Sequence, residues 1–108
     1  MNNTYQIYLI SDSTGETLER IFLALKAQFK NFNYKIHQYS FTRTENQILK
    51  ILDICGKQKN SIILYTIVDS KLAKFLDQES SKIKISCFGV LGDLIISFSK
   101  LLKQEASH

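Results

Sequence analysis

The sequence predicts an α/β fold of the Rossmann-like kind, with a parallel sheet of about four strands and alternating helices. Three observations predict it. Short apolar runs alternate with helix-like amphipathic stretches, the stretch between two runs is long enough for a helical crossover, and polar turn residues follow each run. We therefore expect residues 1–108 to form a single three-layer α/β/α domain, a length that supports one hydrophobic core.

The individual elements follow from these patterns in chain order. Residues 5–10 are almost continuously apolar, which is typical of a central strand covered on both faces. Residues 16–30 place their apolar side chains on one helical stripe, and Thr44 with Gln47 forms a capping box before a second helix that Gly56 ends. The other expected elements are strands at 34–41, 61–66 and 82–88 and helices at 70–79 and 90–104.

Composition and charge exclude several classes of protein. The net charge is +4, but lysines spread along the chain supply most of the positive charge, a pattern typical of solvated surface and not of nucleic-acid binding. Cys55 and Cys87 lie too far apart for a metal-binding knuckle. The first ten residues contain neither a basic segment nor a long apolar one, so we expect a cytoplasmic protein with reduced thiols and no membrane contact.

The turns that follow the strands are expected to meet in space. In a parallel sheet with right-handed crossovers, every strand-to-helix turn lies at the same edge of the sheet. Residues 11–16, 41–45, 66–70 and 88–93 should therefore converge. The last helix should pack over the sheet, and because further strands are absent the chain should also expose apolar surface and associate.

The first turn, SDSTGE, has two interpretations. Gly15 lets backbone approach a ligand, the hydroxyls of Ser13 and Thr14 are close by, and the first N–H groups of a helix attract anions. Arg43 ends the next strand at the same edge and could bind a phosphate with two hydrogen bonds. The alternative is an ordinary helix cap, because Ser13 and Glu16 have capping-box spacing. Spacing alone favours the cap.

Other candidate sites are weaker. His37 lies within a strand without a partner at the spacing of a catalytic triad, so we expect a structural role, and His108 is the final residue. Three acidic residues in the turns could in principle collect magnesium, but such residues are more often caps, and no metal site is expected; they are Asp12, Asp69 and Asp93. The segment CGKQKN lacks the upstream glycine and the following Ser or Thr of a P-loop.

A family resemblance covers nearly the whole chain. The segments IYLISDSTGETLERI, FTRTENQI, IILYTIVDSKL and CFGVLGDLI, in this order, resemble the amino-terminal part of the pyruvate, phosphate dikinase regulatory proteins. That resemblance implies a bifunctional enzyme, namely an ADP-dependent serine/threonine kinase that inactivates the dikinase by phosphorylating a threonine and a phosphate-dependent pyrophosphorylase that reverses this step. ADP and phosphate are thus implied for the full-length family, and the dikinase is the implied partner.

The resemblance also predicts what these residues lack. Family members are longer, and their carboxy-terminal kinase domain with its P-loop lies beyond the segment that resembles this chain. Since phosphoryl transfer depends on positioning phosphates and neutralising their charge, we expect the 108 residues alone to be inactive, to need no cofactor by themselves and to require a separate carboxy-terminal half. The alternative is a non-catalytic α/β module that binds an anion or a partner protein.

Overall fold

Four parallel strands form one sheet in the order β2-β1-β3-β4 in the computed structural model, which describes residues 3–106. The strands are β1 (Thr4–Ser11), β2 (Asn33–Tyr39), β3 (Ser61–Thr66) and β4 (Ser86–Gly89), and the helices are α1 (Glu16–Lys26), α2 (Glu45–Gly56), α3 (Ser70–Lys82) and α4 (Gly92–Leu102). The alternating order and the parallel sheet confirm the predicted Rossmann-like fold, with β1 in the middle and β2 at an edge.

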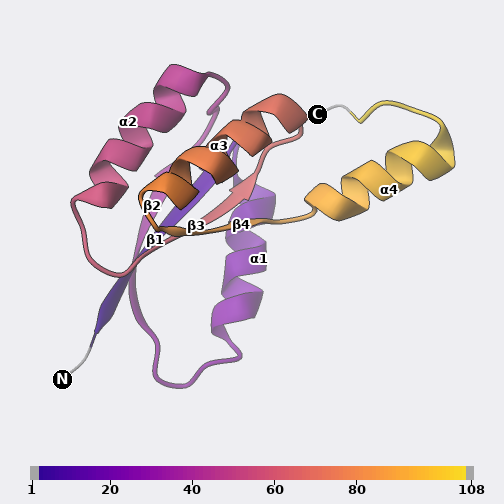
Figure 1. Ribbon diagram of the computed structural model, residues 1–108. Coiled ribbons are helices and arrows are strands. Elements are labelled where there is room, and N and C mark those ends of the chain that lie inside the picture. The colour runs from indigo at the N-terminus through magenta and orange to yellow at the C-terminus, as the bar shows by residue number, and fades with distance from the viewer. Residues whose placement is uncertain (1–2, 107–108) are drawn as a thin grey trace.

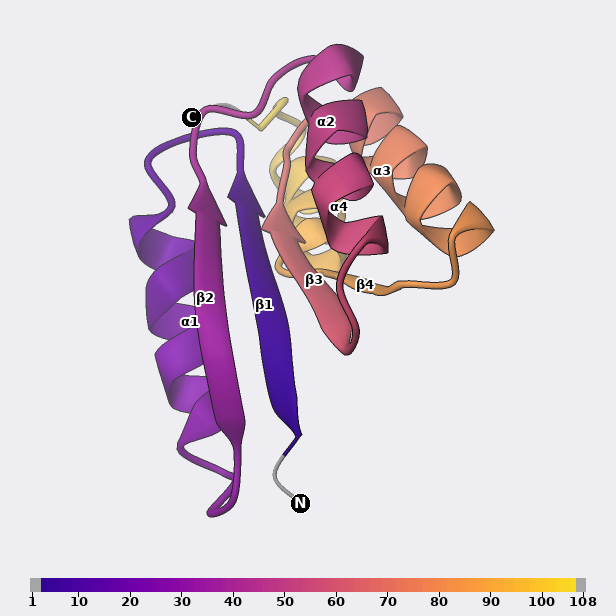
Figure 2. The same cartoon turned by 90° about the vertical axis from the view of Figure 1, so that its left-hand side faces the viewer.

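The helices form layers on the two faces of the sheet. Helix α1 covers one face beside β1 and β2, whereas α2 and α3 lie together on the other face (Figure 2). This arrangement follows from right-handed crossovers, because the chain moves one way from β1 to β2 and the opposite way from β2 through β3 to β4. The strand order therefore determines which face each helix covers.

Alternation along β1 divides the core between the two faces. Tyr8 and Ile10 point toward α2 and α3, whereas Ile7 and Leu9 point toward α1, and all four are buried. The core beneath α2 and α3 is the larger one and also contains Ile48, Ile51, Leu52, Cys55, Ile63, Tyr65, Ile67, Leu72 and Leu76. The core beneath α1 adds only Leu18, Phe22 and Leu64. The sheet is therefore covered unequally on its two faces.

The predicted end of α1 needs correction. Helix α1 stops at Lys26 and not near residue 30, because the amides of Gln28 and Phe29 bond to carbonyls three residues earlier and tighten the chain into turns. Helix α2 begins with the predicted capping box of Thr44 and Gln47. Gly56 is the last residue of this helix, as predicted, and the cap residue that follows is Lys57.

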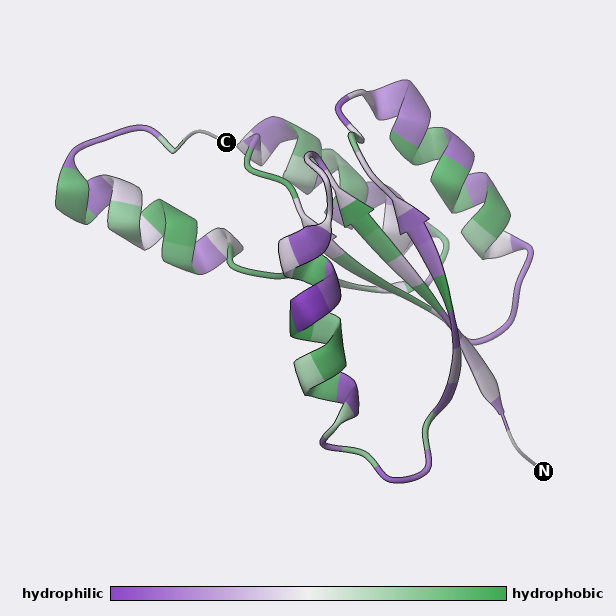
Figure 3. Cartoon of the chain, turned by 180° about the vertical axis from the view of Figure 1, so that it is seen from behind, coloured by the Kyte–Doolittle hydropathy of each residue, from purple (hydrophilic) through white to green (hydrophobic). Residues whose placement is uncertain are grey.

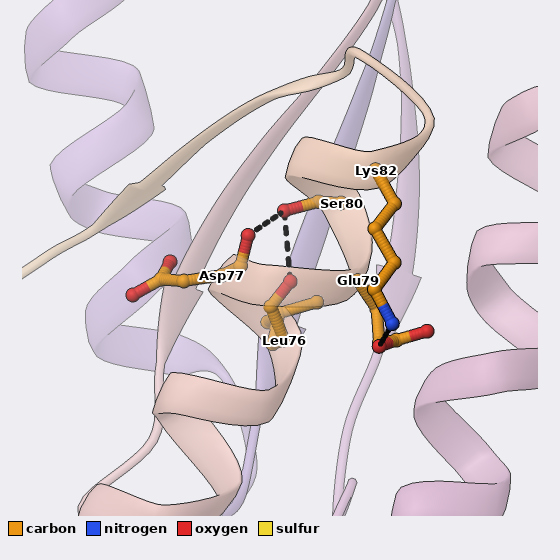
Figure 4. Close-up of polar contacts among 5 residues, drawn as sticks. All are labelled: Leu76, Asp77, Glu79, Ser80 and Lys82. Carbon is orange, nitrogen blue, oxygen red and sulfur yellow. Dashed lines mark hydrogen bonds and ion pairs between the residues drawn. The ribbon is translucent and has the colours of Figure 1, made fainter.

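The end of α3 explains why β4 is shorter than predicted. The helix continues to Lys82, and within it the Ser80 hydroxyl lies 2.8 and 3.1 Å from the carbonyl oxygens of Leu76 and Asp77 (Figure 4). Lys84 then adopts a left-handed conformation with φ 59°, and the Ile85 amide donates back to the Ser80 carbonyl. These residues form the helix end, so the strand begins only at Ser86.

Helix α4 does not pack over the sheet as the sequence predicted. None of its residues is buried, and the helix extends away from the other elements beyond β4 (Figure 1). The chain leaves the sheet at Leu91, which precedes α4 in a left-handed conformation with φ 70°. Most apolar side chains of α4 are consequently exposed, namely Leu94, Ile96, Phe98, Leu101 and Leu102, and Figure 3 shows hydrophobic residues along this helix. The chain measures 51 × 31 × 21 Å along its principal axes.

The two cysteines are free thiols in the core beneath α2 and α3. Burial raises the pKa of the Cys55 thiol to about 12, and burial is also the main cause that raises the pKa of Cys87 to about 12. Both groups therefore stay protonated at neutral pH, where a thiol behaves as a small apolar side chain. Neither cysteine has the low pKa of a catalytic nucleophile.

Gly89 provides a test of packing between β3 and β4. A Cβ atom at this position would lie 2.8 Å from the Tyr65 hydroxyl oxygen, and Tyr65 is held by burial and by a 2.9 Å hydrogen bond to Asp77. We expect Gly89→Ala to lower the free energy of unfolding by about 1–3 kcal/mol in urea titrations, as overpacking does. Gly92→Ala is the matched control, since a Cβ there meets nothing within 4 Å. Equal stability of the two variants would contradict this description.

Candidate anion site at the carboxyl edge of the sheet

Backbone hydrogen bonds join the first two strand-to-helix turns. The amide of Phe41 donates to the Ser13 carbonyl at 2.9 Å, and the amide of Thr42 donates to the Ser11 carbonyl at 2.9 Å. The Ser40 hydroxyl adds a 2.8 Å bond to the Thr14 carbonyl. The predicted convergence of residues 11–16 and 41–45 is thus confirmed.

The third and fourth turns reach the same edge. The carboxylate of Asp12 accepts a 2.7 Å hydrogen bond from the Val68 amide, and the Asp12 amide donates to the Thr66 carbonyl. The Val90 amide donates to the Tyr65 carbonyl at 2.8 Å. Asp12 is only 6% exposed, so its carboxylate connects two turns in the interior. This contact gives Asp12 a structural role that its position in the sequence did not reveal.

Ser11 is the second group that sequence reasoning missed. Its buried hydroxyl accepts a 3.1 Å hydrogen bond from the Ser13 amide and lies 3.3 Å from both the Ser13 hydroxyl and the Thr66 hydroxyl. The signal available in the sequence was that the apolar run of β1 ends in a hydroxyl residue, where another apolar residue would have extended the strand. Ser11 thereby fixes the start of the turn.

The start of α1 differs from the predicted capping box. Gly15 occupies the cap position with φ 89°, and no side chain caps the helix. Ser13 lies further back and contacts Ser11, while the closest hydroxyl contact to the first turn is 3.5 Å, from the Glu16 amide to Thr14. The Ser13–Glu16 cap was therefore a wrong prediction. The amides of the first turn point outward without a side-chain cap, as an anion site requires.

The backbone conformation at Gly15 explains the glycine. At φ 89° an L side chain is strained, whatever space surrounds it. The space itself is adequate, because a Cβ there would lie 3.5 Å from the Ser40 hydroxyl oxygen and 3.7 Å from the Ser11 Cβ. Glycine is required here by the left-handed turn that joins β1 to α1.

Arg43 lies against the first turn. Its Nε donates a 2.9 Å hydrogen bond to the Asp12 carbonyl, and its guanidinium carbon lies 5.3 Å from the centre of the Phe41 ring. The side chain is exposed to solvent despite these two contacts. The structure thus brings Arg43 together with the segment that contains Ser13, Thr14 and Gly15. Arg20, by contrast, is exposed on α1.

Phe41 is a non-glycine residue with a left-handed backbone conformation at this edge. Its φ of 54° is left-handed, and its amide and carbonyl are both bonded, to the Ser13 carbonyl and to the Gln47 amide group respectively. Such conformations persist only where the surroundings determine them. Here the capping box of α2 and the first turn together hold the residue that supports the Arg43 guanidinium.

The remaining candidates have structural contacts. His37 bonds to the Gln6 side chain at 2.7 Å and stacks on Tyr8 with ring centres 4.6 Å apart, in line with the expected structural role. Asp69 caps α3 by accepting from the amides of Lys71 and Leu72. Within residues 3–106, no group of three or more His, Cys, Asp or Glu side chains is arranged to hold a metal ion. His108 lies outside the described residues.

Comparison with known proteins identifies the family of this chain. The family model described as "Kinase/pyrophosphorylase" matches residues 7–108. The chain belongs to the kinase/pyrophosphorylase family. This membership confirms the resemblance found in the sequence, and it places the turn of residues 11–16 and the Arg43 turn inside the matched region of the kinase/pyrophosphorylase chain.

Relatives of this kinase/pyrophosphorylase chain carry a common name. A "Putative pyruvate, phosphate dikinase regulatory protein" of Pelagibacter ubique (strain HTCC1062) is 67% identical over 108 residues, which are 100% of this chain and 39% of the relative. Proteins of the same name from Geotalea uraniireducens (strain Rf4) and Agrobacterium fabrum are 39% and 40% identical, over 90% and 91% of this chain and 36% of each relative. The chain thus spans well under half the length of these relatives. Among the described residues, no helix is long and apolar enough to cross a membrane.

A pair of substitutions tests the corrected capping assignment. Thr44→Ala removes a side chain that accepts a hydrogen bond from the Gln47 amide, so we expect the free energy of unfolding to fall by about 1 kcal/mol. Ser13→Ala removes no helix cap, so it should cost less in the same urea titrations. If Ser13→Ala lowers the free energy of unfolding more than Thr44→Ala does, Ser13 caps α1 after all and the corrected assignment is wrong.

Proposed function

We propose that this chain supplies the amino-terminal part of a bifunctional regulator of pyruvate, phosphate dikinase. The regulator phosphorylates a threonine of the dikinase with ADP as donor and removes the phosphoryl group with inorganic phosphate. The observation that carries the proposal is the family match over residues 7–108, supported by the name shared by the relatives. A soluble cytoplasmic protein with serine/threonine specificity and bound ADP is part of the same proposal.

Within this regulator, we assign oxyanion binding to Ser13, Thr14, Gly15 and Arg43. The uncapped amides at the start of α1 supply oriented donors with the positive end of the helix dipole behind them. Arg43 supplies the positive charge, and its Nε bond to the Asp12 carbonyl holds the guanidinium at the turn. Both substrates of the reaction pair carry phosphate, so an oxyanion site suits either of them.

The chemistry itself requires more than these residues. Phosphoryl transfer depends on groups that surround the transferred phosphoryl and neutralise its charge, which a P-loop does in many nucleotide-binding enzymes. No P-loop pattern occurs in the 108 residues. The family resemblance locates that loop in the carboxy-terminal part, so this chain contributes one side of a site that a carboxy-terminal half completes.

A chimaera tests the proposed activity. In it, this chain replaces the matched part of the Pelagibacter ubique relative, to which it is 67% identical over its whole length. We expect both the parent protein and the chimaera to inactivate the dikinase with ADP and to restore its activity with phosphate. The 108-residue chain alone should transfer no radiolabelled phosphoryl group. An active parent with an inactive, folded chimaera would overturn the proposed function.

Phosphate titration tests the site in the chain alone. We expect saturable amide shifts near Gly15, and Arg43→Ala should weaken the affinity roughly tenfold because a charged hydrogen-bond donor is lost. Arg43→Lys should weaken it less, since the charge remains. Arg20→Ala is the matched control, because it removes the same charge from an exposed position on α1. Equal phosphate affinity in wild type and Arg43→Ala would contradict the anion site, and residues 11–16 would then be only a turn between β1 and α1.

A second candidate function is a binding module without catalysis. The exposed apolar surface of α4 favours it, because such surfaces mark contacts with other proteins. Under this alternative, the chain binds an anion or a partner protein and the chimaera shows no transfer activity.

A further inference from the structure

The sheet is incomplete on the side of β4. Strand β4 pairs only with β3, and it is the last strand in the order β2-β1-β3-β4. Since the Val90 amide points toward β3, alternation directs the amides of Cys87 and Gly89 toward the open edge. Parallel strands are normally covered on both faces, and an exposed edge strand presents unpaired amides and carbonyls with which a further strand can pair. The edge of β4 is therefore available to one more parallel strand.

Helix α4 buries none of its residues against the rest of residues 3–106. It has 11 residues, a length at which an isolated helix is only marginally stable in water. Leu94 and Phe98 lie one turn apart and are each 57% exposed, and Leu101 is 77% exposed. In a β-α-β unit, the helix between two parallel strands packs on the sheet. Helix α4 follows β4 as such a crossover helix, and among the described residues no strand follows it.

The face beneath α1 has an apolar groove that reaches β4. The groove has a volume of about 450 Å³ and lies beside α1 over β1, β3 and β4; its walls include Ile7, Phe22, Leu25, Phe29, Leu64 and Phe88. Phe88 is the residue that β4 contributes, and it is 55% exposed. The bare edge and the unpacked helix lie on the β4 side of the molecule, whereas β1 at the centre is buried on both faces. One additional strand beside β4 would cover the edge and give α4 a surface to pack on.

We propose that the β4 edge and α4 form the docking surface for the segment that follows the matched region in the longer relatives. This segment adds a parallel strand beside β4 and packs α4 against the sheet. The length of those relatives supports this occupant, because the part matched by this chain makes up only 39% of the Pelagibacter ubique protein and lies in its amino-terminal part. The proposal rests on the proposed function, since it identifies how the carboxy-terminal half joins this chain.

Hydrogen exchange in the chimaera and in the 108-residue chain tests this proposal directly. In the chain alone, the amides of α4 should exchange rapidly, as in a helix without tertiary contacts. In the chimaera, the amides of residues 92–102 and of Cys87 and Gly89 should exchange at least about tenfold more slowly. Equal exchange rates in the two proteins would overturn the proposal.

A double substitution adds a second readout. Leu94→Glu with Phe98→Glu places charges on the surface that is expected to become buried, so it should abolish the protection of α4 in the chimaera and lower its Tm. In the chain alone, the same change should leave Tm within about 1 °C, because neither side chain is buried there. Leu49→Glu is the matched control, as Leu49 is 45% exposed on α2, and it should affect both proteins alike. Full protection in the doubly substituted chimaera would also overturn the proposal.

Two further outcomes distinguish the proposed docking surface from dimer formation and from the proposed function. If light scattering shows that the chain forms a dimer that the double substitution dissociates, and the chimaera gains no protection, the occupant is a second copy and the proposal is wrong. If the chimaera transfers phosphoryl groups while α4 stays unprotected, the docking surface is wrong and the proposed function stands. If α4 becomes protected in a chimaera that has no transfer activity, the docking surface stands and the proposed function is wrong.

Discussion

The two backbone hydrogen bonds that join residues 11 and 13 to residues 41 and 42 hold together the carboxyl edge of the sheet, where the candidate site lies. They connect the turn after a buried central strand to the turn after an edge strand, which parallel pairing alone does not position. These bonds bring the turn that carries Arg43 against residues 11–14, where the Arg43 Nε donates to the Asp12 carbonyl. The Asp12 carboxylate connects a third turn to these two, because it accepts a hydrogen bond from the Val68 amide. The candidate site thus depends on main-chain contacts more than on any side chain within it.

A second constraint concerns how a parallel sheet is covered. At β1 the requirement is met, since Tyr8 and Ile10 are buried under two helices and Ile7 and Leu9 under a third. At β4 it is not met, and the same chain there exposes an edge, a helix and a groove. The contrast runs across one sheet of four strands, from a central strand covered on both faces to an edge strand that is not.

The sequence predicted the order of elements, the parallel sheet and the convergence of the turns, because apolar periodicity and crossover length depend on local residues. It located β3 at residues 61–66 and the capping box of Thr44 with Gln47 as the structure has them. It failed at α4, whose amphipathic pattern shows that a face prefers burial but not whether anything is present to bury it. It also failed at Ser13, since capping-box spacing cannot report the left-handed backbone at Gly15 that moves the cap.

The reliance of the candidate site on main-chain bonds has an evolutionary consequence. Amides and carbonyls are present whatever the side chain, so substitutions at Ser13 or Thr14 leave the bonds between the turns in place. Only Gly15, through its backbone conformation, restricts the choice of residue strongly. A turn held by main-chain bonds can therefore exchange its hydroxyl groups without rebuilding the fold that presents them.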